Sequence, residues 1–146
     1  MFKLVKILGA NSNVPELIRV PMSDVNNLYV GHMYYVDNGK VMSIRDHDYA
    51  QLICSMQEIY LEDGAQNALC FLVTPEMVFE ASVENKPSYI TVGQQFKMAF
   101  GDEEEGVAIR TDLSDGDEVC GIIVNTNSYA STGKVLVKFH CIKGAN

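Results

Sequence analysis

Short apolar segments separated by turn-forming residues occupy the second half of the sequence, and this spacing is the feature that most constrains the fold. Strands are expected over residues 68–73, 77–83, 89–92, 96–100, 107–109, 119–124 and 134–142. Glycine, proline or aspartate lies in most of the connections, as is typical of tight turns. Strands that recur about every 8–12 residues predict a mainly β fold, either a small barrel or a sandwich.

The residues before this region contain one predicted hairpin and one candidate helix. Asn38-Gly39 tolerates the positive φ angles of a tight hairpin turn, and strand-like segments flank it at residues 29–36 and 40–44. Helical spacing then appears in Tyr49, Leu52, Ile53, Met56 and Tyr60. Asp48 and Gln51 are suited to cap this segment, although Ile59 and Leu61 interrupt its apolar stripe. The prediction is a mainly β chain with one short helix as the only helical candidate.

Residues 1–28 are expected to form an extended N-terminal arm, and residues 29–146 a single β-rich domain. Pro15 and Pro21 bracket a short apolar piece, and each proline removes a backbone donor, which disfavours a central strand. The arm can lie across a neighbouring subunit or across its own barrel. Deleting residues 2–20 is expected to weaken association while the barrel stays folded. The candidates for partner contact are apolar and aromatic: Phe2, Leu4, Leu17, Ile18, Tyr34 and Tyr35.

The negative charge is concentrated in one stretch. The chain has 11 Lys and Arg against 19 Asp and Glu, a net charge of −8, and residues 102–118 hold eight of the acids and one base. Most of the remaining surface is therefore near neutral and suited to packing against other protein. No dense basic cluster indicates nucleic-acid binding. The longest apolar run, residues 68–73, is far shorter than the roughly 20 residues of a membrane helix, so no membrane partner is expected.

Two clusters contain residue types that bind metals. Asp112, Asp115 and Asp117 are candidate calcium ligands, helped by residues 103–105 if the two acidic loops are neighbours. Leu113 and Ser114 break the alternating ligand pattern of a calcium hand, so solvated turns are the alternative. The other cluster is Arg45-Asp46-His47-Asp48, but adjacent residues of an extended strand point to opposite faces and would not converge on one ion. A solvated turn is the simpler interpretation.

The cysteines are expected to be buried thiols. Their positions are widely separated and include no C-x-x-C pair, whereas zinc sites usually draw ligands from local pairs: Cys54, Cys70, Cys120 and Cys141. The sequence also lacks a nucleophile elbow, a dinucleotide-binding loop and a P-loop. No catalytic residue, cofactor-binding residue or cofactor is therefore assigned, and the chain is not expected to be an enzyme.

From about residue 66 onward, the chain contains an ordered series of short motifs. The series is Phe71-Leu72-Val73-Thr74-Pro75, Val78-Phe79-Glu80-Ala81, Val92-Gly93, Gly106-Val107-Ala108, Ser114-Asp115-Gly116-Asp117 and the closing strand from Gly133 to Phe139. This series resembles the small β-barrel decoration proteins on the capsids of tailed bacteriophages. The resemblance covers just over half of the chain. It implies a non-enzymatic virion protein, made in the host cytoplasm, that binds the major capsid protein as a homo-oligomer, with a trimer favoured.

Two other functions remain as alternatives. A ligand-binding barrel for a carbohydrate or a host surface would use exposed tyrosines and the polar loop at residues 125–132. An enzyme would most plainly be metal-assisted at the carboxylate loops. Sugars would raise the melting temperature in the first case, and calcium or zinc would do so in the second.

Overall fold

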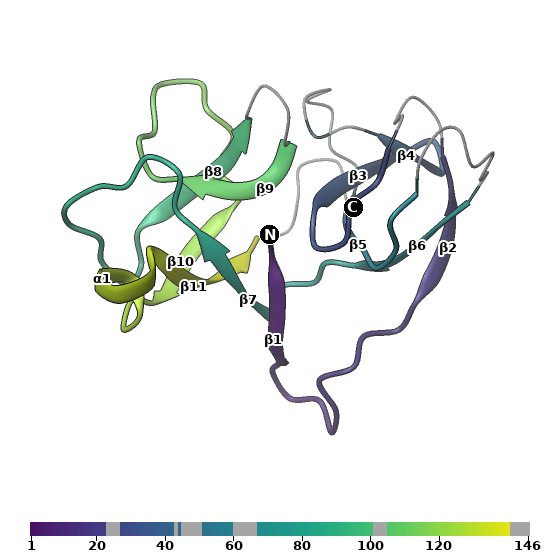
Figure 1. Cartoon of the computed structure of the whole chain (residues 1–146), viewed down its shortest axis with the longest axis horizontal. Helices are drawn as coiled ribbons and strands as arrows, with labels where there is room; N and C mark the ends of the chain where they lie inside the picture. The colour runs from purple at the N-terminus through teal and green to yellow at the C-terminus, as the bar shows by residue number, and fades with distance from the viewer. Residues whose placement is uncertain (23–26, 43, 45–50, 60–66, 101–104, 141–146) are drawn as a thin grey trace.

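The computed structural model (Figure 1) describes residues 1–22, 27–42, 44, 51–59, 67–100 and 105–140. Its strands form two antiparallel sheets, which confirms the predicted mainly β class and fits a small sandwich. The six-stranded sheet runs in the order β1 (Lys3–Ile7), β7 (Met77–Ser82), β11 (Lys134–Phe139), β10 (Gly121–Asn125), β8 (Gln95–Phe100) and β9 (Glu105–Arg110). The five-stranded sheet runs in the order β2 (Ile18–Pro21), β6 (Asn67–Leu72), β5 (Gln51–Ser55), β3 (Met33–Asp37) and β4 (Lys40–Met42).

The predicted hairpin is confirmed as β3 and β4. These strands pair antiparallel in the register Tyr35↔Met42, Val36↔Val41 and Asp37↔Lys40. Asn38 and Gly39 form the two-residue turn with φ angles of 50° and 75°. Positive φ at both positions matches the right-handed twist of the strands, which explains why Asn-Gly is favoured there.

The helix predicted from Tyr49 to Leu61 is wrong over residues 51–59, the part of it that the structure describes. Residues 51–55 form the strand β5, which pairs with β3 on one side and β6 on the other. Leu52, Ile53 and Cys54 are all buried, because both faces of this strand contact apolar side chains. A short, continuous apolar run suits a strand buried on both faces as well as a helix, so its period is ambiguous. The short helix of the described structure is α1 (Tyr129–Thr132) instead.

A second correction concerns residues 89–92, which were expected to form a strand. They form no strand in the structure, and Thr91 N–H donates to Gln94 Oε1 at 3.2 Å. Ile90 alone points into the core, whereas Tyr89 and Val92 are 76% and 63% exposed. The apolar residues of this segment are therefore divided between the core and the surface.

The N-terminal arm lies across its own chain and contributes a strand to each sheet. β1 pairs with β7 and β2 pairs with β6, each as an edge strand. The edge position of β2 agrees with the prediction that Pro21 would keep this piece out of a sheet centre. A deletion of residues 2–20 would remove β1 and most of β2, so we expect it to destabilise the fold as well as any association.

An aromatic cluster joins the two sheets. Phe2 contacts Phe79 and Phe139 edge to face, with ring centroids 6.4 and 5.7 Å apart. Phe71 of the five-stranded sheet stacks on Phe79 at 6.1 Å. These rings belong to one core that includes residues of both sheets, and a second, smaller core lies on the other face of the five-stranded sheet.

Both sheets curl until distant strands meet. A parallel bridge between Met22 and Val41 brings the end of β2 to β4, at the opposite edge of its sheet. Likewise, Val83 follows β7 and bridges Ile109 of β9, and Glu84 N–H donates to the Ile109 carbonyl at 2.9 Å. These bridges cover part of the free edges of β2, β4 and β9. A fully exposed edge would favour pairing with another chain.

Replacing Phe2 with alanine should destabilise the protein by about 3–5 kcal/mol, because it empties a site at the contact between both sheets. The side chain is only 2% exposed. Urea unfolding followed by circular dichroism measures the loss. Val14→Ala is the matched control, since Val14 is 77% exposed and its truncation should change the free energy of unfolding by no more than about 0.5 kcal/mol. Equal stability of the two variants would contradict the role given to Phe2.

Candidate functional site

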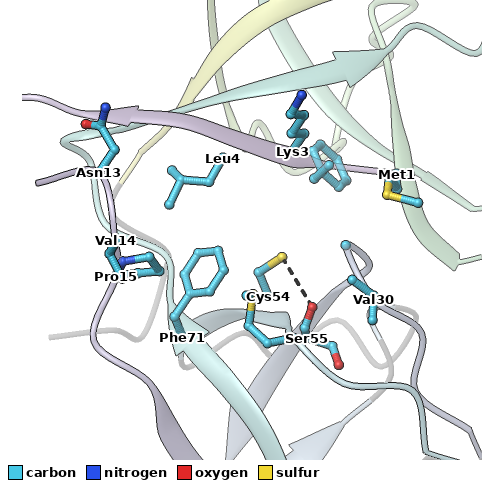
Figure 2. A pocket seen from close by; sticks show the side chains of 13 residues that line it. Met1, Lys3, Leu4, Asn13, Val14, Pro15, Val30, Cys54, Ser55 and Phe71 are labelled. Carbon is cyan, nitrogen blue, oxygen red and sulfur yellow. Dashed lines mark hydrogen bonds between the residues drawn. The ribbon is translucent and has the colours of Figure 1, made fainter.

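A pocket of about 360 Å³ lies between β1 and the five-stranded sheet (Figure 2). Its walls come from the first residues of the chain, from residues 13–15, from residues 30–31 and from β5 and β6. Leu4 and Phe71 project toward the space from opposite sides, whereas Lys3 points away from it. The apolar lining consists of Met1, Phe2, Leu4, Val14, Pro15, Val30, Cys54, Met56 and Phe71.

Backbone hydrogen bonds hold the pocket open between its two walls. Phe2 N–H donates to the Gly31 carbonyl at 2.8 Å, and Gly31 N–H donates to the Ser55 carbonyl at 3.0 Å. Gly31 has a φ of +78°, and a Cβ there would lie 2.9 Å from the Phe2 carbonyl oxygen, so glycine is required at this contact. At the other end, Ile7 N–H donates to Asn13 Oδ1 at 3.1 Å and folds residues 8–15 back toward β1.

The hydroxyl group of Ser55 in the pocket wall already has hydrogen-bond partners. Ser55 Oγ donates to the Gln57 carbonyl at 2.8 Å and accepts from Gln57 N–H at 3.3 Å. Burial raises the pKa of the Cys54 thiol to about 12, so this group stays protonated at neutral pH. A wall with these properties recognises apolar groups, and neither Ser55 nor Cys54 has the surroundings of an activated nucleophile.

Large apolar side chains remain exposed around the mouth of the pocket. They come from separate parts of the chain and comprise Met1, Val14, Val30 and Met56. We define this set together with the pocket as the N-terminal pocket surface. Several apolar side chains around one apolar cavity are typical of a protein contact site.

A second exposed apolar group lies on the connection between β7 and β8, which reaches the far left of Figure 1. It consists of Tyr89 and Val92, and Tyr89 is the most exposed aromatic residue in the described part of the chain. The hydroxyl of Tyr129 donates to the Pro87 carbonyl and fixes this connection against α1. We call residues 85–94 the Tyr89 loop.

The structure places the predicted partner-contact residues mainly inside the fold. Phe2, Tyr34 and Tyr35 are buried, so their side chains contribute to the cores of the chain itself and are unavailable to a partner in this state. Leu4 and Ile18 are partly buried, and Leu17 is exposed. The rings of Tyr34 and Tyr35 do point to opposite faces of β3, as expected, but each face has its own core.

Sequence reasoning missed the exposed side chains Val14, Val30 and Met56. Val14 carried one signal, because it is an apolar residue in an otherwise polar break before Pro15. Val30 and Met56 lie inside segments that were interpreted as strand and helix, so nothing in the sequence distinguished them from core residues.

Two of the three calcium candidates are engaged in ion pairs. Asp112 accepts two hydrogen bonds from Arg110, at 2.9 and 2.6 Å, and Asp117 accepts from Lys97 Nζ at 2.8 Å and from Ser114 N–H at 2.7 Å. Asp115 is exposed in the turn between them. No group of three or more candidate metal ligands occurs among the residues that the structure describes.

Two histidines lie in the described part of the chain, at positions 32 and 140. His32 lies beside Tyr29 with ring centroids 5.2 Å apart, and His140 is exposed after β11. The cluster at residues 45–48 and most of the second acidic loop, residues 101–104, lie outside the described residues. Over the described ranges, no helix has the length and apolar character needed to cross a membrane.

Three of the four cysteines are buried and unbonded, as predicted, and the fourth, Cys141, lies outside the described residues. Burial raises the pKa of Cys54 and Cys70 to about 12 and that of Cys120 to about 11. A thiol whose pKa is raised by folding stabilises the folded state while it stays protonated. This stabilisation is complete below the pKa of the unfolded thiol, about 9, and is lost as the pH rises through the pKa of the folded thiol. The free energy of unfolding should therefore fall as the pH rises above about 9.

In a Cys141→Ser variant, the three described thiols should react slowly with a thiol reagent such as DTNB at pH 8. The thiolate population of Cys54 or Cys70 is about a thousandfold lower than that of an exposed thiol. Unfolding in guanidinium chloride should expose all three to rapid reaction. Rapid labelling of the folded variant would contradict the burial of these groups.

The Lys97–Asp117 pair makes a separate prediction at acid pH. The hydrogen bond from Lys97, followed by that from Ser114 N–H, lowers the pKa of Asp117 below its ordinary value. A carboxyl group whose pKa is lowered by folding stabilises the folded state while it is ionised. This stabilisation is complete above the pKa of the unfolded carboxyl group, near 4, and is lost as the pH falls through the pKa of the folded group. Asp117→Asn should therefore reduce the loss of melting temperature between pH 5 and pH 2. Asp115→Asn, in the same turn, is the control, and an equal effect of both would contradict the pairing.

Comparison with known proteins finds no matching family model, no matching curated protein and no matching solved structure.

Proposed function

We propose that this chain is a non-enzymatic structural protein that binds the surface of a bacteriophage capsid and reinforces it. The observation that carries the proposal is the placement of large apolar side chains on the surface while the chemically reactive groups serve the fold. The N-terminal pocket surface and the Tyr89 loop are exposed, whereas three thiols are buried and Asp112 and Asp117 form ion pairs. Exposed apolar residues together with buried or ion-paired reactive groups favour a protein that acts by binding another protein.

The capsid is the surface that the sequence resemblance implies, with the major capsid protein as the partner and the virion as the location. The N-terminal arm supports an assembly role because β1 and β2 pair with strands of both sheets. A partner bound to exposed residues of the arm would therefore be attached to both sheets of the fold. An apolar cavity with an apolar rim also suits the centre of a stable contact, where water must be excluded. A homo-oligomer is part of the proposal.

A ligand-binding barrel is the second candidate, and one observation favours it. A smaller pocket of about 230 Å³ is lined by polar groups of Glu80, Asn125, Ser128 and Lys134, next to the loop that was expected to bind carbohydrate. Sugar hydroxyls would find both donors and acceptors there. Tyr129 is partly buried and bonded to Pro87, so the exposed aromatic residue for this function would be Tyr89. A shift in melting temperature with a panel of oligosaccharides, lost in Asn125→Ala, would favour this function.

Phage particles produced from a genome that carries the gene should contain the chain, and particles made without it should release their DNA at a lower temperature. Reinforcement adds contacts that must break before the shell opens, so adding the purified chain should restore heat resistance. Quantitative mass spectrometry of gradient-purified particles measures the first result, and DNA release on heating measures the second. Particles without the chain, or with unchanged heat resistance after its removal, would contradict the proposal.

A further inference from the structure

We propose that the outer face of the six-stranded sheet binds an anionic oligosaccharide, one that carries carboxylate or sulfate groups. This binding would be additional to the capsid role. It rests on the second candidate function, carbohydrate binding, to which it adds a charge on the ligand and a set of lysines. Three observations carry it: the charges of this face, the polar pocket beside them, and the kinds of side chain that the face lacks.

Lysines from both ends of the sequence meet on the outer face of this sheet. Its inner face is fixed by the core, where Phe79 of β7 and Val137 of β11 are buried, and side chains alternate between the two faces along each strand. The charged residues of β1, β7 and β11 lie on the outer face: Lys3, Lys6, Glu80, Lys134 and Lys138. They carry four positive charges and one negative, a net charge of +3, in a chain of net charge −8. Glu76, in the turn before β7, lowers this value only to +2.

These charges are close to one another because β7 lies between β1 and β11 in the sheet. Neighbouring strands are about 4.8 Å apart and residues along a strand about 3.3 Å, so the lysines frame an area roughly 10 Å wide and 13 Å long. Lys134 Nζ lies 3.6 Å from Glu80 Oε1. Lys3 and Lys6 are exposed and Lys138 is half-buried, and none of them forms an ion pair with another residue that the structure describes. Three ammonium groups are therefore available to an anionic ligand.

The polar pocket of about 230 Å³ lies at the same face. Its lining joins two members of the charged set to two polar residues at the end of β10 and in the connection that follows: Glu80, Lys134, Asn125 and Ser128. Within the described part of the chain, no hydrogen bond engages the Ser128 hydroxyl or the side-chain N–H groups of Asn125. Sugar hydroxyls both donate and accept hydrogen bonds, so they suit a pocket that offers an ammonium, a carboxylate, a hydroxyl and an amide.

The composition of the face favours a carbohydrate over other polyanions. Single-stranded nucleic acids are bound largely by stacking of bases on aromatic side chains. The aromatic residues of β1, β7 and β11 are Phe79 and Phe139, and both are buried in the core. Lysine and glutamate are depleted at protein interfaces, where tyrosine, tryptophan and arginine are enriched. A lysine-rich face with a polar pocket therefore suits an anionic sugar chain better than a nucleic acid or an acidic protein.

The test is isothermal titration calorimetry of the purified full chain with probes that differ in charge and backbone. A heparin-derived hexasaccharide carries sulfates, a galacturonate hexamer carries carboxylates, and maltohexaose is the neutral sugar of the same length. Oligothymidylate and polyglutamate represent the other polyanions. We expect at least one of the two anionic hexasaccharides to bind about tenfold or more tightly than the last three probes, because charge-assisted hydrogen bonds are about twice as strong as neutral ones. Added salt should weaken this binding.

Variants locate the binding on the sheet face. Lys3→Gln/Lys138→Gln removes two unpaired ammonium groups and should weaken binding about tenfold or more. The matched control is Arg19→Gln/Lys40→Gln, which loses the same charge at exposed positions of the five-stranded sheet and should bind like the wild type. Ser128→Ala should weaken binding about threefold through loss of the pocket hydroxyl. Circular dichroism and urea unfolding verify that all variants are folded.

Several results would overturn the inference. These are failure of both anionic hexasaccharides to bind, equally tight binding of oligothymidylate or polyglutamate, and an equal loss of affinity in the two double variants. Equal affinity for maltohexaose would also overturn it, although carbohydrate binding as such would stand. None of these results bears on whether the chain is found in phage particles, so this inference and the capsid proposal fail separately.

Discussion

The packing of Phe2 between the two sheets is the interaction on which the remaining structure depends. Its ring contacts Phe79 and Phe139 of the six-stranded sheet, while its N–H donates to Gly31, which in turn donates to Ser55 at the end of β5 in the five-stranded sheet. One residue thus combines apolar burial with a backbone connection between layers. Because β1 begins at the next residue, this anchor also sets where the first strand joins β7.

The same anchor creates the pocket. β1 is held at one end by Gly31 and at the other by the return of residues 8–15, so its inner face cannot close fully onto β5 and β6. The resulting cavity is lined by carbon and protonated sulfur, and its wall hydroxyl is satisfied internally. A cavity of this kind offers dispersion and hydrophobic contact to an apolar group.

Much of the architecture was predictable because local patterns and tertiary structure agree. Alternation in residues 134–139 and the Asn38-Gly39 turn specify their strands and hairpin without reference to distant residues. The helix predicted around β5 failed for a physical reason: this strand is apolar on both faces because each face meets a separate core, so its sequence loses the period of two. The burial of Phe2 was not predictable for a similar reason, since it depends on rings that lie more than 70 positions away in the sequence.

The sequence by itself determined the β class, the Asn38-Gly39 turn, the concentration of acid in residues 102–118 and the burial of the three cysteines that the structure describes. These properties depend on composition and on neighbours within a few residues. Only the tertiary structure decided which apolar residues stay exposed, since Val14, Val30 and Met56 differ from core residues in position and not in chemistry. It also decided the partners of Asp112 and Asp117, because an ion pair depends on which strands the fold brings together.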